Sequence, residues 1–248
     1  MIRTSIWRLG MGAAFVLFTA LAVRGALPTS ALLAQPGGTP TATASCDAVT
    51  PMAGTPTVNA DGMAMGTPMA SMEMEMEADQ LYIDMMIPHH ASIIAMAEAI
   101  LPRLTDQRLQ EIAQSIITAQ GAEIGELRAY RERFYGSPEP MPMDATMMGM
   151  MKQMMPGMGD MDQMSMQMDP AAQVAAVCAG SNPDLAFIDA TIPHHQMAIA
   201  SSESMLDQMV HPETKAFAQR VIADQQRELD ELATIRADVS SMATPEGS

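Results

Sequence analysis

The stretch DMMIPHH at residues 84–90 returns as DATIPHH at residues 189–195, and this duplication decides the fold. A shift of 105 residues superposes residues 79–136 on residues 184–241 without a gap. The matches continue beyond the two stretches, since Ile94, Gln120, Glu123 and Glu126 recur as Ile199, Gln225, Glu228 and Glu231. A gapless repeat of this length indicates one structural unit used twice.

Each copy of the repeat predicts a helical hairpin. In the first copy, apolar residues and one histidine recur every three or four positions, which places them on one helix face: Tyr82, Met86, His89, Ile93, Met96 and Ile100. Residues 109–134 carry the same period in a second helix. Two such hairpins can bury their apolar faces against each other, so we expect an all-α fold, a four-helix bundle with pseudo-twofold symmetry.

A proline lies inside the first helical pattern of each copy, at Pro88 and Pro193. Proline removes one backbone hydrogen bond, so each helix either begins at the proline or continues through it with a kink. The apolar period reaches back to Leu81 and Tyr82. This favours a kinked helix that starts before the proline.

The segments outside the repeats differ sharply in composition. Residues 1–34 place Arg3 and Arg8 before an apolar run, which predicts an export signal, with an uncleaved membrane anchor as the alternative. Residues 35–78 form a Pro-, Thr- and Met-rich tether that we expect to be disordered, and residues 242–248 form a flexible tail. The protein is therefore expected to be periplasmic or extracellular, and membrane-tethered if the signal is retained.

Thirteen of the 28 residues from Met141 to Met168 are methionine. Because Pro, Gly and Asp interrupt residues 137–170, we expect a Met-rich crossover loop that orders only partly without metal. A short helix over residues 171–177 is expected to precede the second hairpin, so that residues 171–241 form the second repeat unit.

Methionine sulfur is a soft, neutral donor that favours Cu(I) and Ag(I). The close spacing of sulfurs in the crossover therefore predicts metal capture by Met148, Met151, Met154, Met155, Met158, Met161 and Met164. The alternative is that methionine serves as an adaptable apolar filler. Met96 lies on a helix face, where core packing is the first interpretation, although it remains a candidate ligand.

Four of the five histidines form the two pairs His89–His90 and His194–His195. Imidazole binds copper in either oxidation state, and facing pairs would offer up to four donors. Adjacent helical residues point about 100° apart, so the alternative is that one histidine of each pair binds metal while its neighbour makes a supporting hydrogen bond.

Carboxylates recur at equivalent positions of the two copies. Glu123 and Glu228 lie beside apolar seams, where an unpaired charge is costly, so each requires a partner such as a metal ion. Asp84 and Asp189 are further candidate ligands. Hydrogen bonds to the histidines or to nearby glutamines would explain the carboxylates nearly as well.

The cysteine content and the charge narrow the possible classes of protein. Cys46 and Cys178 are the two cysteines, and in an exported chain they favour one disulfide, with a Cu(I) thiolate site as the alternative. The formal net charge is −16. Such a surface disfavours nucleic acid and anionic lipid as partners.

The two hairpins with their His-His pairs and Gln-x-x-Glu motifs resemble the family known as domain of unknown function 305. The resemblance covers residues 79–241 and is strongest from Met85 to Ala97; the second copy departs at Ala190, Thr191 and Ser201. It implies a ferritin-like four-helix fold, and some family members are exported copper-binding proteins.

Together these patterns predict an exported protein that binds copper, as Cu(I) through methionine and as Cu(I) or Cu(II) through histidine, with silver as a second metal. Its role would be buffering, delivery to a copper-handling protein, or resistance. One alternative is a ferritin-like oxidase of Cu(I) or Fe(II), although the Glu-x-x-His pattern of di-iron bundles is missing. Another is a partner-binding bundle without metal. The oligomeric state is left open.

Overall fold

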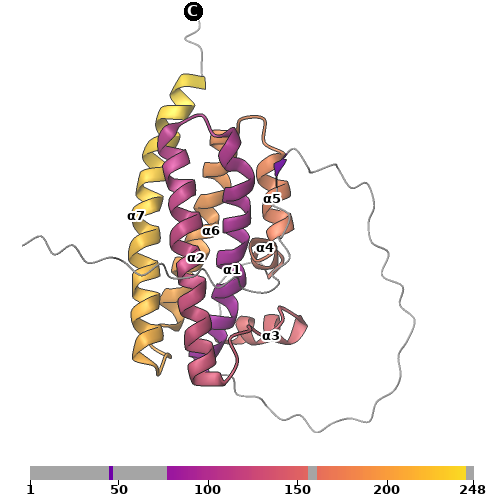
Figure 1. The fold of residues 1–248 in the computed structure, drawn as a ribbon, viewed down its shortest axis with the longest axis vertical. Helices are drawn as coiled ribbons and strands as arrows, with labels where there is room; N and C mark the ends of the chain where they lie inside the picture. The colour runs from indigo at the N-terminus through magenta and orange to yellow at the C-terminus, as the bar shows by residue number, and fades with distance from the viewer. Residues whose placement is uncertain (1–44, 47–76, 156–160, 244–248) are drawn as a thin grey trace, which may run out of the picture. The chain divides into compact units, whose positions relative to one another are not determined.

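The computed structural model describes residues 45–46, 77–155 and 161–243. Helix α1 (Ala78–Ile100) runs into a short 3-10 turn, η2 (Leu101–Arg103), and packs against α2 (Gln107–Tyr135). Helix α6 (Pro183–Met205) packs in the same way against α7 (Pro212–Ala243). Contacts of α1 with α6 and of α2 with α7 join the hairpins into one bundle (Figure 1). The predicted ferritin-like four-helix bundle is confirmed.

Short polar residues define where the helices begin and end. The Asp106 carboxylate accepts a hydrogen bond from the Arg108 N–H (2.9 Å) and caps α2. Gly136, with φ of 78°, ends α2 in the left-handed conformation that favours glycine. Asn182 caps α6 by accepting from the Leu185 N–H (3.1 Å). These local signals separate the long helices.

The two hairpins hold each other reciprocally through one aspartate each. Asp79, at the start of α1, accepts hydrogen bonds from the backbone N–H groups of Val210 (2.7 Å) and His211 (3.1 Å), in the turn between α6 and α7. Its repeat equivalent Asp184, at the start of α6, accepts from the Thr105 N–H (2.8 Å) in the turn between η2 and α2. Each helix start is thereby tied to the turn of the other hairpin.

Both internal prolines lie within continuous helices. Pro88 is inside α1 and Pro193 is inside α6, each several turns from the helix start. The prediction that the helices begin before the prolines is confirmed.

The crossover between the hairpins is more ordered than we expected from the sequence. It contains α3 (Ala145–Met154) and α4 (Met161–Gln167), and α5 (Pro170–Cys178) follows as the predicted short helix. The prediction of a loop over residues 137–170 is therefore wrong for these segments. Asp144 caps α3 and Asp169 caps α5 through side-chain oxygens, and methionine itself favours helix.

Several crossover methionines are core residues. Met147, Met151, Met155, Met164 and Met168 are buried in one cluster with Met85 and Met86 of α1, and we call this set the methionine cluster. Two pairs of these methionines have helical i,i+4 spacing: Met147/Met151 in α3, and Met164/Met168, of which Met168 directly follows α4. Branched aliphatic residues are scarce in this segment, but flexible thioethers fill a core equally well.

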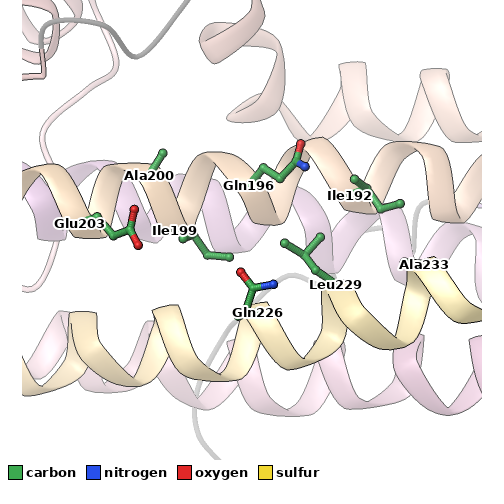
Figure 2. Close-up of a pocket in the computed structure, with 8 residues that line it drawn as sticks. All are labelled: Ile192, Gln196, Ile199, Ala200, Glu203, Gln226, Leu229 and Ala233. Carbon is green, nitrogen blue, oxygen red and sulfur yellow. The ribbon is translucent and has the colours of Figure 1, made fainter.

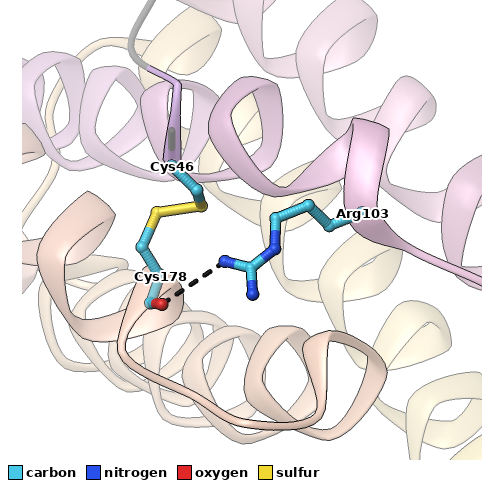
Figure 3. Close-up of a disulfide and its surroundings, with 3 residues drawn as sticks. All are labelled: Cys46, Arg103 and Cys178. Atoms are coloured by element: carbon cyan, nitrogen blue, oxygen red, sulfur yellow. Dashed lines mark hydrogen bonds between the residues drawn. A yellow bond between two sulfur atoms is a disulfide. The ribbon is translucent and has the colours of Figure 1, made fainter. Parts of the chain in front are cut away.

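A disulfide joins Cys46 to Cys178, 132 residues apart in the sequence, which confirms the predicted pairing and excludes a thiolate ligand in this state (Figure 3). Both cysteines are half-buried against the core. The Arg103 guanidinium donates to the Cys178 carbonyl (3.3 Å). The end of α5 is thus held both by residue 46 and by the turn that follows α1.

Several sequence predictions fall on residues outside the described ranges. These are the export signal at residues 1–34, all but residues 45–46 and 77–78 of the tether, and residues 244–248 of the tail. Among the described residues, no helix combines the length and the apolar character needed to cross a membrane.

Candidate metal centre

The four paired histidines are buried where α1 and α6 meet. The rings of His89 and His194 face each other across this interface, with centroids 3.7 Å apart. His90 lies 6.1 Å from His89, and His195 lies 6.4 Å from His194, between ring centroids. The imidazoles therefore form a row through the core in the order 90, 89, 194, 195, which we call the histidine row.

A glutamate lies at each end of the histidine row. His90 Nε2 is 2.8 Å from Glu123 Oε2, and His195 Nε2 is 2.6 Å from Glu228 Oε2. An ionised carboxylate only accepts hydrogen bonds, so each Nε2 carries a hydrogen, and in the neutral ring Nδ1 then presents the lone pair. The glutamate side chains are 19% and 18% exposed, so they connect the buried row with the surface.

Ser92 and the end of α4 contact the row near its middle. The Ser92 hydroxyl lies 2.9 Å from His194 Nε2 and also contacts the backbone carbonyls of His89 and Gln167. Its single hydrogen is donated to a carbonyl, so its oxygen accepts from the His194 Nε2–H. The lone pair of His194 is therefore also on Nδ1.

Many polar atoms around the row are buried without a hydrogen-bond partner. Among the described residues they include both ring nitrogens of His89 and Nδ1 of His90, His194 and His195. The side-chain oxygens of Gln120 and Gln225, one turn before Glu123 and Glu228, are unpartnered as well. Leaving such groups unsatisfied costs about 1–3 kcal/mol each, so their concentration in one place marks the row as the candidate binding site.

Burial also fixes the charge state of the central histidines. Desolvation holds the pKa of His89 well below its ordinary value of 6.5, and the neighbouring His194 and His90 lower it further. Desolvation, followed by His195 and His90, does the same for His194. Both rings are neutral at pH 7, which is the form of imidazole that binds metal.

The donor atoms of the row suit a soft or borderline metal ion. Their resting geometry, however, does not bring them together around one point. Neutral imidazole nitrogens supported by carboxylates suit copper. However, no three His, Cys, Asp or Glu side chains of the described chain converge on one point. The His89 and His194 rings lie against each other with their planes tilted by 38° and their centroids 3.7 Å apart, so an ion between them would require at least one ring to turn.

The two candidate aspartates have arginine partners instead of a place in the row. Asp84 is buried and forms a two-point pair with Arg131. Its repeat equivalent Asp189 is exposed and pairs with Arg236 at 2.9 Å. Because the arginines satisfy both carboxylates, neither aspartate needs a metal ion as its partner.

The candidate methionines fall into different environments. Met96 is fully buried among Ile93, Ile100 and other apolar residues, as core packing predicts. Of the crossover candidates, Met151, Met155 and Met164 belong to the methionine cluster, whereas Met148 and Met154 are half-buried against it. Met158 and the side chain of Met161 lie outside the described residues. Metal binding by these sulfurs remains a prediction.

Sequence reasoning missed three residues that shape the site. Arg131 and Arg236 are themselves repeat equivalents, so the 105-residue shift contained the signal that would have paired them with Asp84 and Asp189. Ser92 carried no such signal, because position 197 in the second copy is methionine.

The chain matches the model of a known protein family. The family model for DUF305, a domain of unknown function, matches residues 30–131 and 79–236. The chain belongs to the DUF305 family. The uncharacterised protein L153 of Acanthamoeba polyphaga mimivirus is 39% identical over 51 residues, which is 21% of this chain and 34% of that protein. The match thus spans about a third of the length of this curated relative.

Solved structures share the bundle. CopM in its Cu(I)-bound form is 27% identical, and in an Ag-bound form 26%, each with a TM-score of 0.50 over 64% of this chain and 96% of CopM. A DUF305 protein from Streptomyces coelicolor has the same TM-score at 18% identity, covering 69% of this chain and 96% of that protein. The second likeness shows the fold alone.

Proposed function

We propose that this protein is an exported copper-binding protein whose buried site is the histidine row, with Cu(I) as the main cargo and Ag(I) as a second ion. The observation that carries the proposal is the set of unpartnered imidazole nitrogens in the core. A purely structural bundle gains nothing from leaving these nitrogens unsatisfied, whereas ligation removes the penalty.

The chemistry of the row supports copper over harder cations. His89 and His194 are neutral by burial and provide nitrogen donors, while Glu123 and Glu228 orient the outer rings. Ions such as Mg²⁺ and Ca²⁺ prefer oxygen ligands. CopM binds Cu(I) and Ag, which makes the same ions the natural candidates here. The imidazoles would also accept Cu(II).

The methionines add a second, softer component. Met166 is 55% exposed, and Met141, Met143, Met148 and Met150 lie half-buried around the methionine cluster. We propose that these thioethers capture Cu(I) from solution, while the histidine row holds it more firmly. Buffering, delivery to a copper-handling protein and resistance are all consistent with this division.

Export is proposed on two grounds. Residues 1–34 have the composition of a signal, and the Cys46–Cys178 disulfide fits an oxidising compartment outside the cytosol.

We propose binding without catalysis. An oxidase of Cu(I) or Fe(II) would consume oxygen at many equivalents per protein, and oxygen uptake during the titration described next tests it directly. Uptake limited to the amount of bound metal would support a binding protein, and sustained turnover would establish the oxidase.

The test is a Cu(I) titration against a competing chelator, using residues 35–248 with the disulfide intact. We expect the tightest site to disappear in the double variant His89→Gln/His194→Gln. The matched control is His211→Gln, because this histidine stacks on Phe134 (3.8 Å) outside the row. If the double variant keeps the tightest site while a Met→Ser variant of the crossover loses it, the proposal is wrong and the metal lies among the sulfurs.

A further inference from the structure

The histidine row lies between two apolar clusters of different composition. Along α1, the first cluster ends at Ile87 and the second begins at Ile93, so His89 and His90 lie between them. The first cluster contains the whole methionine cluster. The second is built from branched aliphatic residues, alanine and phenylalanine, and among the described residues Met96 is its one buried methionine. The row therefore has a methionine side and an aliphatic side.

Thioethers lie one helical turn from both central histidines, on the same side of the row. The start of α1 contacts the turn that follows α6, so these two helices run antiparallel. A residue one turn before His89 is therefore on the same side as a residue one turn after His194. Met85 and Met86 occupy the first position and are buried, and Met197 occupies the second, half-buried against the same cluster.

The duplicated sequence does not repeat these thioethers on the other side. The repeat equivalents of Met85, Met86 and Met197 are, in order, Ala190, Thr191 and Ser92. Each equivalent lies one turn from a central histidine on the aliphatic side. Thioether sulfur binds Cu(I) and Ag(I), whereas a methyl group or a hydroxyl does not offer a soft donor. A soft ion therefore finds sulfur next to the row on one side only.

The end of α4 joins the crossover to the row. The Ser92 hydroxyl contacts both the Gln167 carbonyl and His194 Nε2. Met168, the next residue of the crossover, belongs to the methionine cluster. The Gln167 side-chain oxygen is buried without a hydrogen-bond partner in the described part of the chain. On the α3 side, half-buried methionines pack against the same cluster: Met148, Met150 and Met154. The thioethers thus extend from a partly exposed helix to residues that touch the row.

The surface groove between α6 and α7 does not provide an equivalent route (Figure 2). It encloses about 360 Å³, and its lining contains no histidine, cysteine or methionine. Its polar groups are the amides and the carboxylate of Gln196, Gln226 and Glu203. Oxygen donors of this kind suit harder cations than Cu(I) or Ag(I).

We propose that Cu(I) or Ag(I) reaches the histidine row from the methionine cluster, and that Met86 and Met197 pass the ion to His89 and His194. Each step replaces one neutral donor by another, so the oxidation state of the ion does not change. Both imidazoles are neutral and bind through a lone pair, so no proton is released. The proposal rests on the function proposed above and adds the route by which the ion arrives.

The test follows Ag(I) loading of residues 35–248, with the disulfide intact, by stopped-flow competition with a chromophoric chelator. The kinetic phase that reports on the row is the one that His89→Gln/His194→Gln removes. In Met86→Leu/Met197→Leu this phase should be about tenfold slower, because the two sulfurs are lost while the apolar volume is kept. The equilibrium affinity of the row should stay close to that of the wild type.

Two further variants control for effects on folding. Met209→Leu is the matched control, because Met209 is also buried in the first cluster but follows α6, away from the row; we expect the wild-type rate. Met197→Leu alone changes a half-buried side chain. This single variant is expected to fold even if the double variant does not, and to slow the phase by a smaller factor.

The possible outcomes separate the route from the function. Wild-type loading rates in both the single and the double methionine variant would overturn the route. A row that binds more weakly but loads at the wild-type rate would also overturn it, because the sulfurs would then be resident ligands. If His89→Gln/His194→Gln removes no kinetic phase, the proposed function itself is wrong.

Discussion

The two hairpins carry the same ion pair in opposite environments. Asp84 and Arg131 are 0% and 7% exposed, whereas their equivalents Asp189 and Arg236 are each 52% exposed. The difference comes from the crossover, which begins directly after α2: Arg131 also donates to the Ser137 carbonyl (2.9 Å). By contrast, the His–Glu pairs are alike in both halves. The repeated sequence therefore determines the chemistry of the row. The crossover, which only the first hairpin precedes directly, determines which of the Asp–Arg pairs is buried.

The largest effect is expected from breaking the buried pair. Asp84→Ala leaves the Arg131 guanidinium buried without its carboxylate and should lower the free energy of unfolding by about 3–5 kcal/mol. Asp189→Ala removes an exposed pair and should cost about 0–1 kcal/mol. Urea denaturation of both variants measures the contrast. Equal losses would show that burial does not distinguish the two halves.

Acid should weaken the metal-free protein through the centre of the row. Because His89 and His194 have lowered pKa values in the folded state, the unfolded chain binds more protons below its pKa of about 6.5. Stability is complete above pH 7 and decreases as the pH falls through 6.5, by at most about 1.4 kcal/mol per pH unit for each histidine. Thermal melts from pH 7.5 to 5 follow this change.

The matching control is the double variant His89→Gln/His194→Gln, which should lose most of that pH dependence. An unchanged slope would assign the acid sensitivity to other groups and leave the central imidazoles without a role in it.

A smaller effect is expected from introducing the Tyr–Ser hydrogen bond of one half into the other half. The Tyr82 hydroxyl lies 2.9 Å from the Ser202 hydroxyl, and the repeat equivalents are Phe187 and Ala97, both buried in an apolar cluster. Phe187→Tyr should cost about 1–2 kcal/mol, because the new hydroxyl has no partner. Adding Ala97→Ser should recover part of this loss, as a double-mutant cycle would show. No recovery would mean that the two halves are not equivalent at this position.

The sequence predicted the features that depend on the repeat. A gapless register fixed both hairpins, and it placed Glu123 and Glu228 at the same separation from His90 and His195, where the structure finds them bonded. The environment of Asp84 was not predictable in this way, since its equivalent is exposed. The helices of the crossover were not predicted, because Pro, Gly and Asp in this segment indicated a loop, whereas the helix propensity of methionine and the Asp144 cap favour helix.

The most direct measurement is anomalous diffraction at the copper edge, from crystals of the disulfide-bonded protein loaded with one equivalent of Cu(I). We predict a single strong peak beside the facing rings of His89 and His194, with at least one ring turned from its resting orientation. A peak confined to the methionines of α3 and α4, with the row unchanged, would contradict the account.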